Sequence, residues 1–139
     1  MKRILLPVDG SPGCQQALTI AEDIAKKFDS TIVAFCVFDL YRIPNELEYA
    51  GYIEKMYDTD GKKEFLDKTV KYFEDRGIKA EAKLIKGDPP SDIIDEADNG
   101  EYDLVIMCSR GMSTSKRFLL GSVTSKVVHH VKTPILVIK

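Results

Sequence analysis

The apolar positions of this chain alternate between short continuous runs and longer stretches with helical spacing. The runs predict five β-strands, at residues 4–8, 31–38, 80–85, 103–107 and 134–138. Runs that are apolar almost throughout, such as TIVAFCVF at 31–38, are typical of strands covered on both faces, as in parallel sheets. The run at 80–85 alternates more, which indicates a strand with one solvated side.

Between these runs, apolar residues recur at helical spacing and predict four helices. The first is expected to begin at Ser11-Pro12, where a hydroxyl N-cap precedes a proline that needs no N–H. The other helix boundaries are a C-terminal glycine at Gly77, a start at Asp88-Pro89 and a start at Gly121-Ser122. The expected buried faces carry Ala17, Leu18, Ala21, Ile24, Ala25 and Phe28 in the first helix and Leu66, Thr69, Val70 and Phe73 in the second.

Alternating strands and helices predict one α/β domain over residues 1–139, a doubly wound parallel sheet with helices on both faces. In such folds ligands bind beyond the carboxyl ends of the strands, where the strand order reverses. The loops around Asp9 and Cys108 are therefore the first candidate sites. Residues 39–57 hold four tyrosines without a clean period, and they are interpreted as a long, partly helical excursion: a lid, a packed connection or a partner surface.

Composition narrows the function classes. A net charge of −2 without a basic cluster argues against nucleic acid as the main partner. No apolar run approaches the roughly 20 residues of a membrane span, and the N-terminal apolar run is too short for a signal peptide. Three cysteines without a CxxC pair predict neither a disulfide framework nor a zinc site, and they fit a reducing cytoplasm.

Common catalytic and phosphate motifs are absent. Neither GxxxxGK[ST] nor GxGxxG occurs, and no GxSxG accompanies Ser109 or Ser122. His129 and His130 are adjacent on a helix, so their side chains point apart, and we interpret them as structural groups at a helix C-terminus. Cys108 is either a reactive thiol near Arg110 or a small apolar filler at the end of a strand.

The segment MCSRGMSTSKRFLLGSVTSK at 107–126 has the chemistry of an anion site. It combines two glycines with hydroxyls and three cations, and it leads into the start of the last predicted helix, where free N–H groups favour an anion. Ser122 and Thr124 offer hydroxyls to phosphate oxygens or to Mg²⁺. The alternative is that Gly111 and Gly121 are turn and cap glycines and that Ser122 is only an N-cap.

The spacing Cys108-x2-Gly111-x9-Gly121-Ser122 resembles the G-x2-G-x9-G-[S/T] signature of the universal stress protein family. ILLPVDGS, KGDPPSDII and SVTSKVVHHVKTPILVIK agree with the family in chain order, so the resemblance covers nearly the whole chain. It implies a Rossmann-like, adenine nucleotide alpha hydrolase-like sheet of order 3-2-1-4-5. It also implies a homodimer and a site for ATP or AMP, with Mg²⁺, although some members of the family bind no ATP.

Carried over by position, the resemblance assigns the nucleotide site to residues in three groups. Pro7, Val8 and Asp9 would lie on the adenosine side, and Val37 would present backbone to the adenine edge. Gly111, Gly121, Ser122 and Val123 would surround the phosphates, with Thr124 close by and Arg110 as a cation. The alternative for Asp9 is a turn residue beside Gly10.

Cys108 departs from the signature because it replaces the first glycine. If that position needs a positive φ, cysteine costs about 1 kcal/mol or more and could close the site. If it ends the strand in an extended conformation, the replacement is harmless.

Three functions remain open at this point. The first is a dimeric regulatory or stress-response protein that binds ATP and turns it over slowly if at all, because no general base or Walker lysine is evident. The others are an interaction module that binds an unidentified protein partner without nucleotide, and an ATP-pyrophosphatase-type adenylating enzyme. The homodimer would form through the segment TPILVIK, which the family's strand order leaves as an unprotected edge.

Overall fold

Five parallel strands form one sheet of order β3-β2-β1-β4-β5, as the sequence resemblance implied. The structure is a computed structural model that describes residues 1–11, 14–39, 59–109 and 120–139. The strands are β1 (Arg3–Pro7), β2 (Thr31–Asp39), β3 (Ala80–Gly87), β4 (Leu104–Cys108) and β5 (Ile135–Ile138). All four pairings between neighbouring strands are parallel, which confirms the predicted α/β class.

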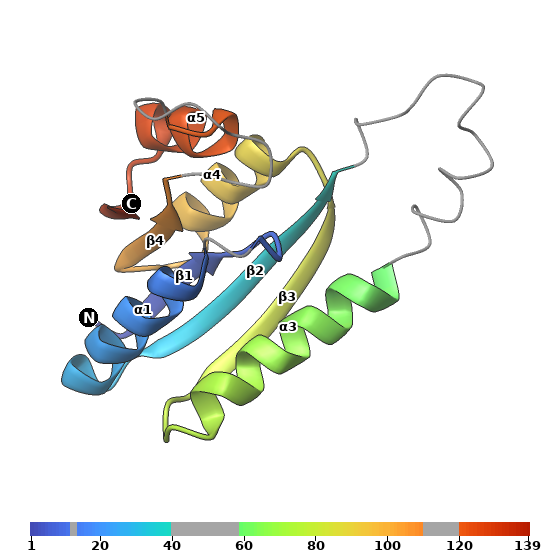
Figure 1. Ribbon diagram of the computed structural model, residues 1–139. Helices are drawn as coiled ribbons and strands as arrows, with labels where there is room; N and C mark the ends of the chain where they lie inside the picture. The colour runs from blue at the N-terminus through green and yellow to red at the C-terminus, as the bar shows by residue number, and fades with distance from the viewer. Residues whose placement is uncertain (12–13, 40–58, 110–119) are drawn as a thin grey trace.

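Helices cover both faces of this sheet (Figure 1). They are α1 (Gln15–Phe28), α3 (Thr59–Glu74), α4 (Pro89–Asn99) and α5 (Ser122–His130). Helices α1 and α3 pack on one face, and α4 and α5 pack on the other. None of the helices in the described ranges is long and apolar enough to cross a membrane.

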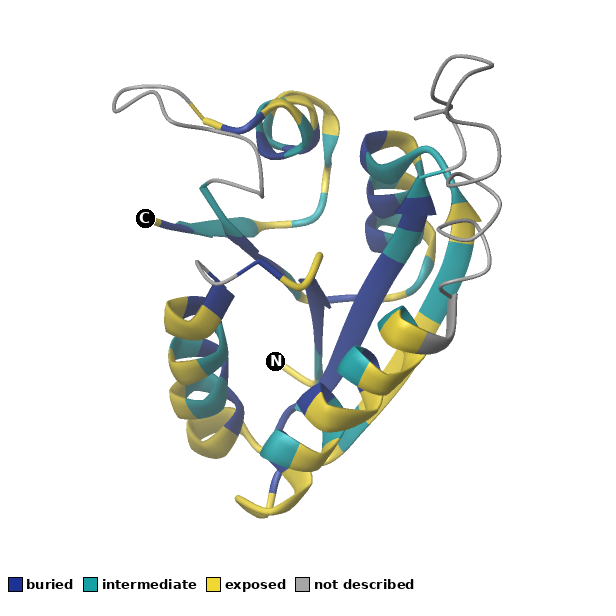
Figure 2. Cartoon of the chain, turned by 45° about the vertical axis from the view of Figure 1, so that its right-hand side comes forward, coloured by how far each residue is buried: buried dark blue, intermediate teal, exposed yellow. Residues whose placement is uncertain are grey.

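Side chains of the central strands alternate between two apolar layers because successive residues of a strand point to opposite faces. Ile4 and Leu6 of β1 pack beneath α1 and α3, whereas Leu5 between them packs beneath α4 and α5. All three are fully buried. Figure 2 shows this pattern: the middle parts of the central strands are buried, and the helices expose their outer sides.

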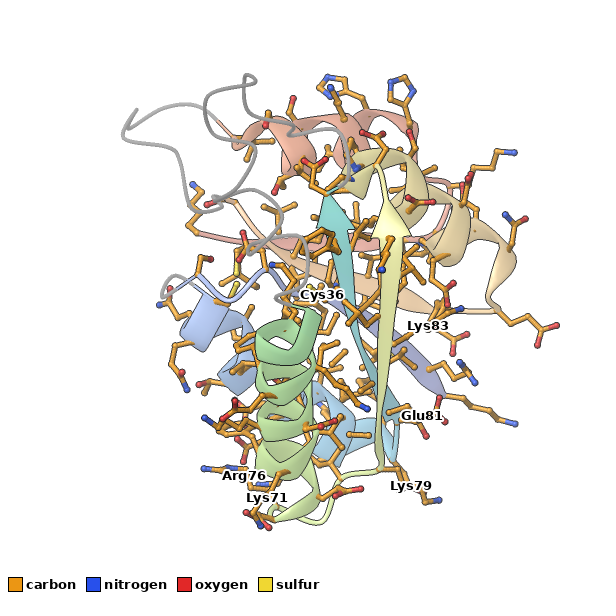
Figure 3. The ribbon with its side chains drawn as sticks, turned by 90° about the vertical axis from the view of Figure 1, so that its right-hand side faces the viewer. Cys36, Lys71, Arg76, Lys79, Glu81 and Lys83 are labelled. Atoms are coloured by element: carbon orange, nitrogen blue, oxygen red, sulfur yellow. The ribbon has the colours of Figure 1, made fainter. Side chains whose placement is uncertain are left out.

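The edge strand β3 is less protected than the central strands, and much of it is exposed. Figure 3 labels Lys79, Glu81 and Lys83 along this edge of the sheet. The Nζ of Lys83 lies 2.6 Å from Oε2 of Glu96 on α4, so a charged pair covers the strand there. Charged side chains on an edge discourage pairing with another chain.

The start of α4 follows the predicted capping chemistry. Asp88 is the N-cap, its Oδ2 accepts a hydrogen bond from Ser91 N at 3.3 Å, and Pro89 opens the helix. At the other boundary, Gly77 has a φ of +76°, which glycine adopts without strain. Both boundaries were read from the sequence.

The start of α1 differs from its prediction, because the helix begins at Gln15 with Cys14 as its N-cap. Asp9 Oδ1 accepts a hydrogen bond from Ser11 N at 2.9 Å, and Cys14 N donates to Ser11 O at 3.2 Å. These bonds make a turn before the helix. Ser11 is therefore a turn residue and not the N-cap.

The buried face of α1 is also narrower than the sequence predicted. It consists of Ala17, Ala21 and Ala25, each at most 1% exposed, whereas Phe28 at the end of the helix is 50% exposed. Small side chains let the helix approach the sheet closely, and the larger Leu18, Ile20 and Ile24 are partly buried against the same apolar layer. The prediction that Phe28 belongs to the core was wrong.

We predict that Phe73→Ala lowers the free energy of unfolding by about 3–5 kcal/mol, because Phe73 is fully buried between α3 and the sheet. Phe28→Ala is the matched control and should change stability by at most about 0.5 kcal/mol. Urea unfolding followed by circular dichroism measures both. Equal losses in the two variants would contradict the packing described above.

Candidate functional site

A crevice opens at the carboxyl ends of β1 and β4, where the strand order reverses. The described pairs of β1 with β4 are Ile4 with Leu104 and Leu5 with Val105, although β4 continues to Cys108. Beyond these pairs lies a cavity of about 290 Å³. Its lining comes from β1, β2, β4 and all four described helices or the residues that cap them: Pro7, Val8, Asp9, Cys14, Phe35, Val37, Phe38, Asp39, Lys62, Pro89, Ile93, Met107, Cys108, Val123 and Thr124.

Six of the ten residues predicted for the nucleotide site line this cavity. They are Pro7, Val8, Asp9, Val37, Val123 and Thr124. Gly121 and Ser122 lie directly before Val123 at the start of α5 but do not line the cavity. Arg110 and Gly111 lie outside the described residues.

Val37 directs its backbone toward the crevice. Val8 N donates to Phe35 O at 2.8 Å, so the backbone groups of Phe35 point toward β1. Backbone groups of a strand alternate in direction with a period of two, and those of Val37 therefore point to the same side. The described ladder between β1 and β2 ends at the pair of Pro7 and Phe35, so Val37 lies beyond its last rung.

The start of α5 faces the same crevice with free donors. Gly121 is the N-cap, and Ser125 N donates to Gly121 O at 2.8 Å as the first intrahelical bond. The N–H groups of Ser122, Val123 and Thr124 precede that bond and have no carbonyl in the helix to bind. Ser122 is thus the first helical residue, and the interpretation of Ser122 as the N-cap was wrong.

Hydrogen bonds fix the helix start against the end of β4. Thr124 Oγ1 donates to Cys108 O at 2.8 Å, and Gly121 N donates to Ser109 O at 2.7 Å. Ser109 N in turn donates to Ile138 O at 2.7 Å. The two ends of the segment at 110–119 are therefore held together, and the Thr124 proton is engaged with the backbone.

The structure places Cys108 as the last residue of β4, paired with Ile138. In the described ranges, the non-glycine residues with positive φ are Asp29 and Glu101. Cys108 therefore ends the strand in an extended conformation, which cysteine adopts without strain. Of the two conformations considered for this position, the structure supports the harmless one.

Asp9 lies at the rim of the cavity and also makes a turn. Its Oδ1 accepts from Ser11 N at 2.9 Å and lies 3.7 Å from the sulfur of Cys14. Gly10 follows with a φ of +83°, a conformation that favours glycine. Asp9 therefore makes a turn, and this turn holds its carboxylate at the crevice. A role of Asp9 in nucleotide binding stays a prediction.

Several cavity residues were missed by the sequence reasoning. Phe35, Ile93 and Met107 are buried and make an apolar floor, while Asp39 and Lys62 add charge at the side of β2 and α3. Ile93 had a usable signal, because its helix begins directly after a strand of the sheet. No sequence signal pointed to Lys62, because it follows the excursion at 39–57, which has no clear pattern. Residues 40–57 of that excursion lie outside the described part of the chain.

The two histidines lie at the end of α5, away from the cavity. His129 Nδ1 lies 2.6 Å from Ser125 O in the last turn of α5, and neither histidine lines the cavity. In the described part of the chain, no three or more His, Cys, Asp or Glu side chains are grouped so that they could hold a metal ion.

Comparison with known proteins shows to which family the chain belongs. The model of the universal stress protein family matches residues 1–139. The chain belongs to this family.

Individual members of the family resemble the chain over most of its length. A universal stress protein of Methanocaldococcus jannaschii is 33% identical over 141 residues, which cover 99% of this chain and 82% of the relative. A second universal stress protein of that organism has a solved structure, which matches this chain with a TM-score of 0.88 at 30% identity. The match covers 99% of this chain and 95% of that one.

A universal stress protein from Archaeoglobus fulgidus was solved in complex with dAMP. Its TM-score is 0.70 at 24% identity, and the match covers 100% of this chain and 98% of that one. At this identity the likeness shows the shared fold.

We predict that Thr124→Val lowers the free energy of unfolding of this universal stress protein by about 1–3 kcal/mol, because it leaves the Cys108 carbonyl without its donor. Thr124 is 4% exposed, and valine keeps its shape. Thr19→Val is the control, since Thr19 makes a similar bond to Gln15 O at 3.3 Å on an exposed face. The comparison uses chemical unfolding, and a loss no greater than that of the control would argue against the tie between α5 and β4.

Proposed function

We propose that this universal stress protein binds ATP, or AMP in its place, in the cavity between β1 and β4 and acts as a nucleotide-dependent regulatory protein. One observation carries the proposal: the same cavity is lined by Val37 of β2, which lies beyond the ladder with β1, and by the first turn of α5 with its free N–H groups. A ligand with a flat hydrogen-bonding ring at one end and an anion at the other matches that arrangement.

The adenine ring is proposed to lie on the β2 side. Phe35, Ile93 and Met107 offer apolar surface for its faces, and Val37 offers backbone groups for its edge. Asp9, at the rim, would accept hydrogen bonds from the ribose hydroxyls or the exocyclic amine. Ligand sites commonly combine an apolar lining with a few placed polar groups.

The phosphates are proposed to lie at the start of α5. N–H groups there and the positive end of the helix dipole favour an anion. The segment with Arg110 and Gly111 would complete the phosphate site, as the family signature implies. Mg²⁺ would come with the nucleotide and take oxygen ligands from its phosphates, and the exposed Ser122 hydroxyl is a further candidate ligand.

ATP turnover is expected to be slow or absent. Thr124, the buried hydroxyl nearest the proposed phosphates, donates to Cys108 O, and Asp9 Oδ1 accepts from Ser11 N. Neither group is placed as a strong general base. A cytoplasmic location fits the three cysteines, which the structure leaves as free thiols.

Relatives support an adenine nucleotide as the ligand class. The fold of this chain is shared with the Archaeoglobus fulgidus protein solved with dAMP. By contrast, Ser11 of the loop considered for an adenylating enzyme is buried, and its hydroxyl lies 3.4 Å from the sulfur of Cys14. That hydroxyl is turned to a thiol rather than to a phosphate site. An interaction module without nucleotide is the alternative that the first test below decides.

We predict that Mg-ATP stabilises the protein, by about 2.7 kcal/mol when ATP is present at about a hundredfold excess over its Kd. Gly121→Val should abolish this effect, because its branched side chain occupies space at the start of α5. Valine can adopt the φ of −57° found at Gly121, so the variant does not strain the backbone. It tests whether the space beside Gly121 is needed for the ligand. Thermal unfolding with and without Mg-ATP is the measurement.

Leu120→Ala is the control for this test, because Leu120 lies next to Gly121 and is 39% exposed. Its response to Mg-ATP should equal that of the unmodified protein. No stabilisation of the unmodified protein, together with no copurifying nucleotide by mass spectrometry, would reject the nucleotide proposal. An unchanged response in Gly121→Val would reject the assignment of the phosphate site.

A homodimer through the edge strand β5 is proposed as the working assembly. Ile138 O and Pro134 O both accept hydrogen bonds from the β4 side, so the backbone groups of Ile135 and Val137 point outward. Ile135, Leu136 and Val137 are only partly buried in the single chain. An apolar edge with outward backbone groups favours pairing with a second copy.

We expect light scattering at micromolar concentration to give the mass of a dimer, and Val137→Lys to shift it to the mass of a monomer. A lysine on an edge strand opposes pairing by its charge. Ala82→Lys on β3, at the other edge of the sheet, is the control and should remain a dimer. A monomeric unmodified protein, or dissociation of both variants, would contradict assembly through β5.

A further inference from the structure

Two of the three cysteines meet in the cavity. Cys14 precedes α1, Cys108 ends β4, and both line the cavity. Cys14 is 6% exposed, and Cys108 is half-buried. The two side chains interact, and each thiol shifts the pKa of the other. Elements far apart in the sequence thus bring two thiols to one cavity, which the exposed Asp9 also lines.

The surroundings make the two sulfurs unequal. The hydrogen bond from Cys108 is the main cause that lowers the pKa of Cys14 to about 7. Burial and the Asp9 carboxylate oppose this shift, and the Ser11 hydroxyl, 3.4 Å away, supports it. The same hydrogen bond and burial raise the pKa of Cys108. At neutral pH the pair therefore consists of a thiolate-forming Cys14 and a Cys108 that keeps its proton.

Cys36 provides a contrast within the same chain. It is 1% exposed and packs in the apolar layer beneath α1 and α3, near the start of α3 (Figure 3). Burial raises the pKa of its thiol. A buried thiol in apolar surroundings is inert, whereas a low-pKa thiol beside a second cysteine is typical of oxidisable sites.

We propose that Cys14 and Cys108 form an oxidisable dithiol site that reacts with hydroperoxides and closes to a disulfide across the cavity. The step is a two-electron oxidation of the two sulfurs. A disulfide would join the start of α1 to the end of β4, beside the start of α5. Its effect on nucleotide binding rests on the function proposed above, whereas its formation does not.

The chemistry balances without a cofactor. The Cys14 thiolate attacks one peroxide oxygen, the O–O bond breaks, and the leaving oxygen takes a proton and departs as an alcohol or water. Cys14 is then a sulfenic acid. The Cys108 sulfur attacks the Cys14 sulfur, the S–O bond breaks, and the hydroxide leaves as water with the Cys108 proton. Two thiols and one hydroperoxide give one disulfide, one alcohol and one water.

Closure of the disulfide would act on the proposed phosphate site through a contact already described. The Cys108 carbonyl accepts the hydrogen bond from Thr124, so a shift of Cys108 toward Cys14 pulls on the first turn of α5. The cross-link also occupies part of the cavity. Oxidation is therefore expected to weaken nucleotide binding.

The first test maps the thiols of the full chain without nucleotide. The reduced protein is treated with hydrogen peroxide, alkylated, and analysed by peptide mass spectrometry without reduction. The expected product is an intrachain link between the Cys14 and Cys108 peptides that dithiothreitol reverses, with Cys36 alkylated only after denaturation. Free Cys14 and Cys108, a link through Cys36, or a link between chains would overturn the proposal.

Variants and pH separate the roles of the two sulfurs. Cys108→Ser, which keeps a donor beside Cys14, should accumulate a Cys14 sulfenic acid that dimedone traps. Cys14→Ala should trap none, and the control Cys36→Ala should form the disulfide normally. The rate of disulfide formation should rise about tenfold from about pH 6 to about pH 8, because the thiolate fraction follows the pKa of Cys14. Asp9, Ser11 and Cys108 surround that thiol. A rate independent of pH, or a sulfenic acid that forms on Cys108, would contradict the assigned roles.

A final measurement addresses the effect on nucleotide binding. Oxidised protein should lose the thermal stabilisation by Mg-ATP and regain it after dithiothreitol. If the disulfide forms and the stabilisation is unchanged, the effect on binding is rejected. If reduced protein shows no stabilisation by Mg-ATP, the proposed function fails, and the peptide map alone decides the dithiol chemistry.

Discussion

The reversal of strand order between β1 and β4 is the constraint on which the rest of the structure depends. The connection after β1 leads to α1 on one face of the sheet, and the connection after β4 leads to α5 on the other. Right-handed crossovers to both faces make the two connections diverge. The divergence leaves a cavity at the carboxyl ends, into which Val37 and the start of α5 turn their backbone groups.

A site made in this way depends little on side-chain identity. The donors at α5 are N–H groups, and the groups of Val37 are backbone as well. Side chains contribute the apolar floor and the few charges at the rim. For the nucleotide site proposed above, this arrangement suits binding more than chemical conversion, because backbone groups bind a ligand without being poised for proton transfer. A regulatory role is consistent with such a division.

The sequence predicted the strands to within about two residues. Continuous apolar runs marked the central strands, which are buried on both faces, and the more alternating run at 80–85 marked the edge strand β3. Asp88-Pro89 was also correct, since the Asp88 carboxylate bonds within its own helix start. Ser11-Pro12 failed because Asp9, two residues earlier, takes the Ser11 N–H into a turn. Helical periodicity likewise could not reveal that alanines make the closest contact of α1.

The candidate site was predictable where topology alone determines it. The rule that ligands bind at the carboxyl ends of the strands led directly to Asp9 and Cys108, and both line the cavity. Lys62 and Phe35 were missed, because their positions depend on how α3 and the sheet pack, and no local pattern records that packing. The sequence also left open whether the backbone of Cys108 has a positive φ or an extended conformation.

The conformation of Cys108 also explains why a cysteine is tolerated where the family signature has glycine. The closure of the following segment uses Gly121 N, Ser109 O and Ser109 N, all of them backbone groups. Thr124 binds the Cys108 carbonyl and not its side chain. The loop ends are thus held by contacts that any residue at position 108 can make. Because these contacts use only the backbone of residue 108, they are compatible with a cysteine there, and its side chain lines the cavity together with Cys14.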